Sequence, residues 1–304
     1  MNFKTFQNLS SDFHKKYYRW HTSGQYEGAE ESNLKFEELI SNPPFRESNE
    51  YYSEELDMID QFFVNLKDAS VLELGCGDGN LTWKLANKCK YLESWDIDNG
   101  GVELTKQRLD ELGIKNVNIL NKNVFEIDPE KVSKQFDVVL FIQVLEHIPS
   151  WDQEECFKKV FSLVNSDGGC LFISTPNRWT LKDSHDTGKY LIHWLPRFIK
   201  VPIAKVFGFG LKIHDPSWPY PPVLHDYVSF SWLKRKAKKF HKGKIRTSRM
   251  EYFPDMDVWY NIKTNKKGNR SKLTYNLLKK VGKLVNLNYY FGSKVIIQKQ
   301  QKAG

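Results

Sequence analysis

The sequence has only four cysteines, and no two of them are closely spaced along the chain. Cys76, Cys89, Cys156 and Cys170 are scattered, without the C-x-x-C pair of many zinc and redox sites. This argues against a disulfide framework and for a reducing compartment. The 304 residues contain no apolar run long and uncharged enough to span a bilayer, and the first residues lack the apolar core of a signal peptide. We therefore expect a cytoplasmic protein, with peripheral attachment to a membrane surface left open.

Acidic residues are scarce in the last third of the chain. Residues 197–304 carry 24 Lys and Arg but only five Asp and Glu, a formal charge of +19, whereas residues 1–196 carry −11. Such asymmetry indicates either an anionic partner, a membrane surface or RNA, or a merely solvated basic surface. Hydrophobic residues make up 40% of the chain, which supports a packed core instead of disorder.

The stretch 71–80 organises the chain. Alternating apolar residues are followed there by glycines at every second position: Gly75, Gly77 and Gly79. We predict a buried strand, a glycine turn and a helix that begins near Asn80, because glycine lets the backbone approach a ligand closely. Glu73 lies inside the apolar strand, where an unpaired carboxylate would be costly. Its expected task is to orient the glycine loop or a bound cation.

A second predicted strand, residues 91–98, ends in two acidic residues, Asp96 and Asp98. Asp96 comes about twenty residues after the glycines, the distance at which an acid can hold the ribose hydroxyls of an adenosine cofactor. Asp98 is an alternative candidate for this role, but we favour Asp96. The spacing G-x-G-x-G differs from the G-x-G-x-x-G of dinucleotide enzymes, and no Lys-Ser or Lys-Thr follows to hold a triphosphate.

Together these motifs resemble the class I S-adenosylmethionine-dependent methyltransferases. The segment from Val144 to Pro149 resembles a subgroup that includes the ubiquinone-biosynthesis O-methyltransferases, and the resemblance covers residues 50–180 by motif and 225–300 more loosely. It implies an α/β, Rossmann-like, doubly wound and mostly parallel seven-stranded sheet with helical additions. Strands that alternate with helices along the chain agree with this fold class. Residues 293–300 are the candidate for the last, antiparallel strand.

The resemblance also implies S-adenosyl-L-methionine as cofactor, bound beyond the carboxyl ends of the strands. Asn123 stands where the family commonly has an acid that bonds the adenine amino group, and its amide can still hydrogen-bond there. Aromatic side chains in residues 13–21 could stack on adenine, shield the sulfonium, or simply pack. The expected cofactor residues are Glu73, Gly75, Cys76, Gly77, Gly79, Asn80, Asp96, Ile97, Asn123, Val124 and Gln143.

The chain divides into an N-terminal cap or arm, residues 1–50, and a methyltransferase domain, residues 51–304. That domain has two expected additions, a lid insertion at 178–228 and a basic addition at 253–292. Within the insertion, residues 190–207 alternate apolar side chains with isolated bases, and two prolines interrupt any long helix. This segment is either a lid with an apolar underside packed on the core, which we favour, or a segment that dips into a membrane surface.

Methylation of a hydroxyl group usually needs a base, and histidine is the natural one near neutral pH. His147 follows the strand that should form the floor of the pocket, so it is the first candidate. The alternatives on the covering segments are His185, His193 and His225, and each could instead be a structural or surface histidine. Glu146 and His147 could also be ligands of a metal ion. Gln143, however, occupies a position where a metal site would need a carboxylate. We expect no metal.

The predicted function is an S-adenosylmethionine-dependent methyltransferase that methylates a hydroxyl group of a small-molecule, glycan or lipid-like acceptor. The alternative is an RNA methyltransferase whose basic C-terminal third binds phosphates. A third interpretation is an inactive protein that uses the cofactor fold to bind a partner, and the intact glycine loop and Asp96 argue against it. The sequence does not identify the acceptor or the oligomeric state.

Overall fold

The computed structural model describes most of the chain, namely residues 4–22, 38, 40–62, 66–180, 183, 189–207, 225–249, 276, 280 and 292–300. His185 lies outside the described residues. So does the basic addition at 253–292, apart from three single positions. The part of the insertion between residues 208 and 224 is also outside them.

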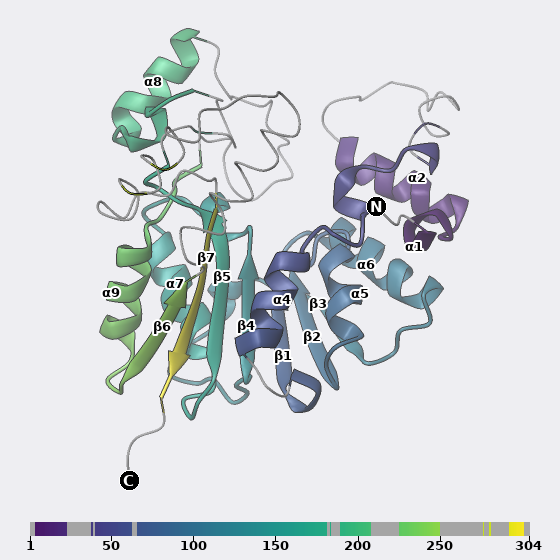
Figure 1. Ribbon diagram of the computed structural model, residues 1–304, viewed down its shortest axis with the longest axis horizontal. Coiled ribbons are helices and arrows are strands. Elements are labelled where there is room, and N and C mark those ends of the chain that lie inside the picture. The colour runs from purple at the N-terminus through teal and green to yellow at the C-terminus, as the bar shows by residue number, and fades with distance from the viewer. Residues whose placement is uncertain are drawn as a thin grey trace.

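The strands of the described residues form one seven-stranded mixed sheet in the order β3-β2-β1-β4-β5-β7-β6 (Figure 1). Neighbours from β3 to β5 pair in parallel, and β7 is antiparallel to both β5 and β6. The prediction of an antiparallel last strand is therefore confirmed. The strands are β1 Ser70–Leu74, β2 Tyr91–Asp96, β3 Val117–Asn121, β4 Val138–Ile142, β5 Cys170–Pro176, β6 Ile245–Arg249 and β7 Gly292–Lys299.

Helices cover both faces of the sheet (Figure 1). One face packs on α7 and α9 through a cluster that includes Leu72, Phe141, Phe157 and Leu233. The other face packs on α4 and α5 through a second cluster that includes Val71, Leu140, Ile59 and Leu85. The helices are α1 Lys4–Gln7, α2 Ser11–Thr22, α4 Ser53–Phe62, α5 Asn80–Ala86, α6 Asn99–Glu111, α7 Gln153–Ser162, α8 Arg197–Phe207 and α9 Phe230–Phe240.

The central strand β4 explains why these two layers form. All five of its residues are buried, as expected for a parallel strand with helices on both faces. Successive side chains point to opposite faces of the sheet, so Val139 and Phe141 join one cluster while Val138, Leu140 and Ile142 join the other. The carboxyl end of β4 is thereby fixed beside that of β1, where the glycine loop begins.

The N-terminal segment packs on the sheet domain through α6. Phe6, Phe13 and Tyr17 form a buried cluster with Leu104 of α6. Three aromatic side chains that are 2% exposed or less give this contact enough apolar area to hold two short helices in place. The segment therefore lies beside the carboxyl end of β2, close to the glycine loop (Figure 1).

The insertion contains the helix α8, although its two prolines were expected to interrupt any long helix. Pro196 precedes α8 and Pro202 lies inside it, yet α8 continues over eleven residues. The buried residues of α8 are Lys200 and Ala204, while Phe198 and Val206 are exposed, so the inner side of α8 contains a base as well as apolar residues. The described helices include none that is long and apolar enough to cross a membrane.

Candidate active site

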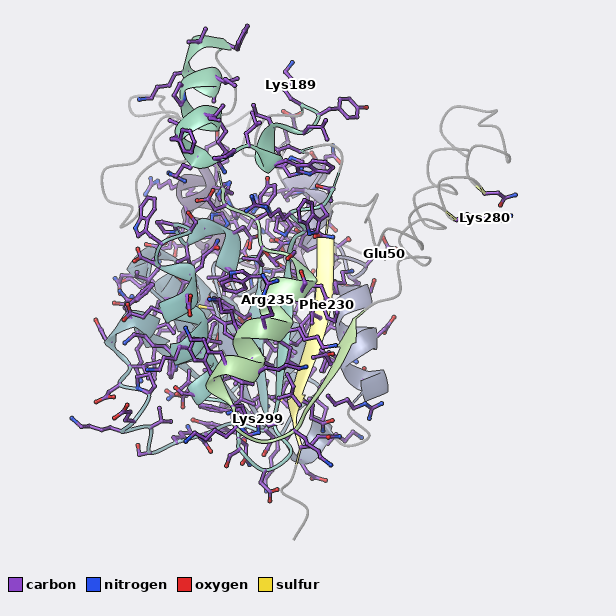
Figure 2. All side chains as sticks on the ribbon, turned by 90° about the vertical axis from the view of Figure 1, so that its left-hand side faces the viewer. Glu50, Lys189, Phe230, Arg235, Lys280 and Lys299 are labelled. Carbon is purple, nitrogen blue, oxygen red and sulfur yellow. The ribbon has the colours of Figure 1, made fainter. Side chains whose placement is uncertain are left out.

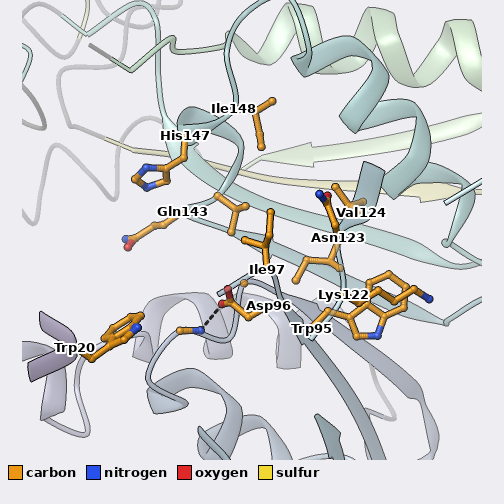
Figure 3. A pocket seen from close by; sticks show the side chains of 14 residues that line it. Trp20, Trp95, Asp96, Ile97, Lys122, Asn123, Val124, Gln143, His147 and Ile148 are labelled. Carbon is orange, nitrogen blue, oxygen red and sulfur yellow. Dashed lines mark hydrogen bonds between the residues drawn. The ribbon is translucent and has the colours of Figure 1, made fainter. Parts of the chain in front are cut away.

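A cavity of about 250 Å³ lies at the carboxyl ends of β1, β2 and β4 (Figure 3). Eight residues that the sequence predicted as site residues line it: Gly75, Gly77, Asp96, Ile97, Asn123, Val124, Gln143 and His147. Six further lining residues were not predicted: Trp20, Leu74, Trp95, Lys122, Val144 and Ile148. Five of the six are sequence neighbours of predicted residues, four of them just at or after strand ends, which is the signal that could have identified them. Trp20 comes from the N-terminal segment.

Asp96 joins the end of β2 to the glycine loop. Its Oδ2 accepts the backbone N–H of Gly77 at 2.7 Å, shown as the dashed line in Figure 3, and its Oδ1 accepts the N–H of Asp98 at 2.9 Å. Burial raises the pKa of Asp96 above its ordinary value, although the hydrogen bonds from backbone N–H groups work against it. The carboxylate therefore sets the position of the loop and faces the cavity.

Asp98 has a structural task instead. Its carboxylate caps α6 by accepting the N–H groups of Gly100 and Gly101 at 3.1 and 3.0 Å. It also accepts the indole N–H of Trp20. This contact fixes the ring of Trp20, which lies 3.4 Å from the point where a Cβ on Gly77 would be. Asp98 thus anchors the aromatic wall of the cavity and does not itself line it.

Glu73, Cys76, Gly79 and Asn80 were predicted as cofactor residues but are not among the cavity-lining residues. Glu73 accepts the hydroxyl groups of Thr82 at 2.7 Å and Ser94 at 2.6 Å, and so links β1 to α5 and β2. Burial raises the pKa of Glu73 to about 7, although these hydroxyls lower it. Its other oxygen, Oε1, has no hydrogen-bond partner among the described residues.

A buried charge cluster whose residues do not line the cavity bonds to the glycine loop. Arg108 of α6 forms a two-point ion pair with Glu47, at 2.8 and 3.1 Å, and donates from Nε to the carbonyl oxygen of Asp78 at 2.7 Å. Asp78 is hydrogen-bonded to His21 of α2 at 3.1 Å. Burial alone would raise the pKa of Asp78, but His21 and Arg108 outweigh burial and lower it. The loop is therefore tied both to α6 and to the N-terminal segment.

Gln143 and Asn123 bring amide groups to the cavity. Gln143 follows β4 with a φ of 55°, a left-handed backbone that is uncommon outside glycine and often found at functional sites. Its N–H is held by the carbonyl of Ser174 at 2.7 Å. Asn123 accepts the N–H of Phe125 through Oδ1 at 2.9 Å. The NH₂ group of Asn123 is therefore the part that can donate toward a ligand.

Two of the four predicted histidines meet at the edge of the cavity. His147 lines it, and its Nδ1 lies 2.8 Å from Nε2 of His225. The two rings are perpendicular, with centroids 4.4 Å apart. His225 comes from a segment that is bonded to the sheet domain, since Gln153 of α7 donates to the carbonyl oxygen of Asp226 at 2.6 Å and the N–H of Arg178 donates to that of Val228 at 3.0 Å.

His193 lies elsewhere. It is buried, and its Nε2 is 2.7 Å from the carbonyl oxygen of Thr180. Glu146 is also buried and accepts the hydroxyl of Thr175 at 3.0 Å. Among the residues that the structure describes, no three His, Cys, Asp or Glu side chains come close enough together to hold a metal ion.

The sheet order, the glycine loop and the acid at the end of β2 define an α/β enzyme that binds an adenosine cofactor. A family model described as "Methyltransferase domain" matches residues 65–204. A ubiquinone biosynthesis O-methyltransferase from a Shewanella strain is 30% identical over 214 residues, which are 69% of this chain and 83% of that protein. The chain belongs to the class I S-adenosylmethionine-dependent methyltransferases.

Further relatives match over a smaller part of their length. A ubiquinone biosynthesis O-methyltransferase from Pseudomonas fluorescens is 34% identical over 116 residues, or 38% of this chain and 47% of that protein. The crystal structure of an S-adenosylmethionine-dependent methyltransferase from Clostridium acetobutylicum shares the fold, with a TM-score of 0.50 and 11% identity over 88% of this chain and 98% of that one. These findings establish a methyltransferase that uses S-adenosylmethionine, and they do not support the RNA alternative.

Proposed function

We propose that the chain methylates a hydroxyl group on a small-molecule, glycan or lipid-like acceptor. The pair of His147 and His225 carries this proposal, because it puts a base at the edge of the cofactor cavity. When bound, S-adenosylmethionine supplies a methyl group on a positively charged sulfur. A hydroxyl acceptor must lose its proton as the bond to this methyl group forms, so a nearby base accelerates the transfer. The similarity to ubiquinone biosynthesis O-methyltransferases supports an oxygen acceptor.

The lining residues fit an adenosine cofactor. Asp96 offers a carboxylate to the ribose hydroxyls, and Ile97 and Val124 offer apolar contacts to the adenine ring. Since Oδ1 of Asn123 already accepts the N–H of Phe125, we propose that its NH₂ group donates to a ring nitrogen of adenine. Glu73, Cys76, Gly79 and Asn80 act indirectly, by shaping the loop.

The histidine pair sets which nitrogen can act as base. One of the two facing nitrogens must carry the proton of their hydrogen bond. If Nδ1–H of His147 donates to Nε2 of His225, then Nε2 of His147 keeps its lone pair and can take the proton of the acceptor. His225 then stabilises the charged imidazole that forms on His147. We propose this arrangement, with His147 as base and His225 as positioning residue.

Residues 4–22 form a cap on the cofactor side of this site. Trp20 lines the cavity from α2 and is held there by Asp98. An aromatic ring at that place excludes water from the charged sulfonium and can contact it through its face.

Gly75→Ala is expected to weaken binding of S-adenosylmethionine about tenfold or more. Gly75 has a φ of 86°, and a Cβ there would lie 2.5 Å from Cγ2 of Val144, a lining residue. Val144 must then move, and overpacking of this kind costs roughly 1–3 kcal/mol. Calorimetric titration of the cofactor measures the loss.

The matched control is Gly168→Ala. Gly168 has a φ of 89°, and nothing lies within 4 Å of its added Cβ. The backbone strain is therefore similar to that in Gly75→Ala, but there is no clash with a neighbouring side chain. We expect normal cofactor binding in this variant and partial recovery in Gly75→Ala with Val144→Ala. Equal losses in both single variants would assign the effect to backbone strain and not to the clash with Val144, and normal binding in Gly75→Ala would show that the cofactor does not contact the loop there.

The function itself is tested by methyl transfer from labelled S-adenosylmethionine to panels of quinols, glycans and RNA, with the product analysed by mass spectrometry. We expect a methyl ether on a quinol or glycan. Transfer to nitrogen or to RNA would overturn the proposal while leaving the cofactor site intact. Failure of the folded protein to bind S-adenosylmethionine would overturn the assignment of the cavity.

A further inference from the structure

The helix α8 exposes an apolar stripe to solvent and buries a lysine on its inner side. Its buried residues are Lys200 and Ala204, at 2% and 0% exposure. Phe198 and Val206 are 76% and 79% exposed, and with Pro202 they form a stripe at positions i, i+4 and i+8. Phe207 is 64% exposed, and Tyr190, just before the helix, is 72% exposed. A surface helix of a globular protein normally buries its apolar stripe.

Ion pairs on the inner side hold α8 in this orientation. Nζ of Lys200 lies 2.6 Å from Oδ1 of Asp226, and Arg197 lies 3.0 Å from Oδ2 of the same residue. The side chains of Lys200 and Asp226 are only 3% and 13% exposed, so water screens this pair little. The helix is thus fixed to the core by its charges and presents its apolar stripe outward.

The sequence around α8 is basic, and two of its bases, Arg197 and Lys200, pair with Asp226. The chain has no acidic residue between Asp186 and Asp215, and this stretch carries five Lys or Arg. Lys189 points outward at the same end of the molecule (Figure 2), and Lys205 is exposed on α8 itself. Exposed apolar side chains flanked by bases are the pattern of a helix that lies in the interface of an anionic bilayer.

We propose that α8 docks the protein on a membrane surface that contains anionic lipids. A second copy of the chain fits the stripe less well, because a two-fold contact of α8 with itself would bring the bases of both copies together. The helix lies beyond the carboxyl ends of the parallel strands (Figure 1), the end at which the cavity opens. Lys200 also bonds the carbonyl of His225. Docking through α8 would therefore place the histidine pair close to the lipid surface.

The test is cosedimentation of the full chain with vesicles of phosphatidylcholine, alone or mixed with phosphatidylglycerol. We expect binding to the mixed vesicles, weakened about tenfold or more by Phe198→Ser with Val206→Ser. Lys205→Glu should weaken it as well. The matched control is Lys244→Glu, which changes net charge equally at an exposed position just before β6, at the other end of the sheet, and should bind almost normally.

Titration with S-adenosylmethionine in each variant keeps this proposal separate from the proposed function, since all variants should bind the cofactor like the wild type. Absence of vesicle binding by the wild type would overturn the proposal. So would equal weakening by Lys205→Glu and Lys244→Glu, which would indicate attraction by net charge alone. A dimer that becomes a monomer in the Phe198→Ser and Val206→Ser variant would assign the stripe to a second copy instead.

Discussion

Replacing His147 with alanine should lower kcat by a factor of about 10² to 10⁴, the usual contribution of a general base. His147 lines the cavity, and its Nδ1 lies 2.8 Å from Nε2 of His225, so in the proposed arrangement Nε2 of His147 is the unprotonated nitrogen. Binding of S-adenosylmethionine should change little, because Asp96, the proposed ribose ligand, lies apart from His147 in the cavity (Figure 3). Steady-state kinetics with the acceptor found by screening, together with cofactor titration, measure both quantities.

Variants of the other histidines separate positioning from catalysis. His225→Ala should reduce kcat less than His147→Ala does, because it removes the positioning contact but leaves the base itself in place. His193→Ala should instead lower thermal stability and leave kcat nearly unchanged, since His193 is buried and bonded to Thr180. A normal kcat in His147→Ala would exclude a general base at this position.

The sheet and the loop could be predicted because their signals are local. The apolar run of β4 and the glycines after β1 lie within a few residues of the elements that they define, and both were placed correctly. Ends of parallel strands meet at one edge of a sheet. For this reason residues as distant as Gly75, Asp96 and Gln143 could be assigned to one site, and the structure brings them to one cavity.

Trp20 could not be selected from the sequence. Its segment was identified as aromatic, but residues 13–21 contain several rings that could face the cofactor. The structure decides through contacts over long sequence distances: Phe13 and Tyr17 pack with Leu104, whereas the indole N–H of Trp20 reaches Asp98. A composition pattern indicates that a segment packs, and only the tertiary structure shows which ring is left for the ligand.

The exposed apolar stripe of α8 could not be predicted from the sequence for a similar reason. Apolar residues with isolated bases normally indicate an apolar underside. Here Lys200 finds Asp226, which lies 26 residues later, along with the carbonyl of His225. That ion pair turns the basic side inward. Periodicity gives the two faces of a helix but not the partner that decides which face is buried.

Arg108→Met should destabilise the protein by about 3–5 kcal/mol, the cost of removing one member of a buried ion pair. The side chains of Arg108 and Glu47 are both 1% exposed, so the carboxylate of Glu47 would remain buried without its counter-charge. Urea unfolding measures the loss. Lys88→Met is the matched control: its pair with Asp60 is 35% and 41% exposed, and a loss of about 0–1 kcal/mol is expected.

The double variant Arg108→Met with Glu47→Leu separates the two tasks of this arginine. Replacing both charges by apolar side chains removes the buried carboxylate, so most of the stability should return. The double variant still lacks the hydrogen bond from Nε of Arg108 to the carbonyl oxygen of Asp78, which holds the glycine loop in place. Affinity for S-adenosylmethionine should therefore be reduced in Arg108→Met and should stay reduced in the double variant. If affinity recovers together with stability, the charge cluster serves the fold alone and the loop keeps its shape without it.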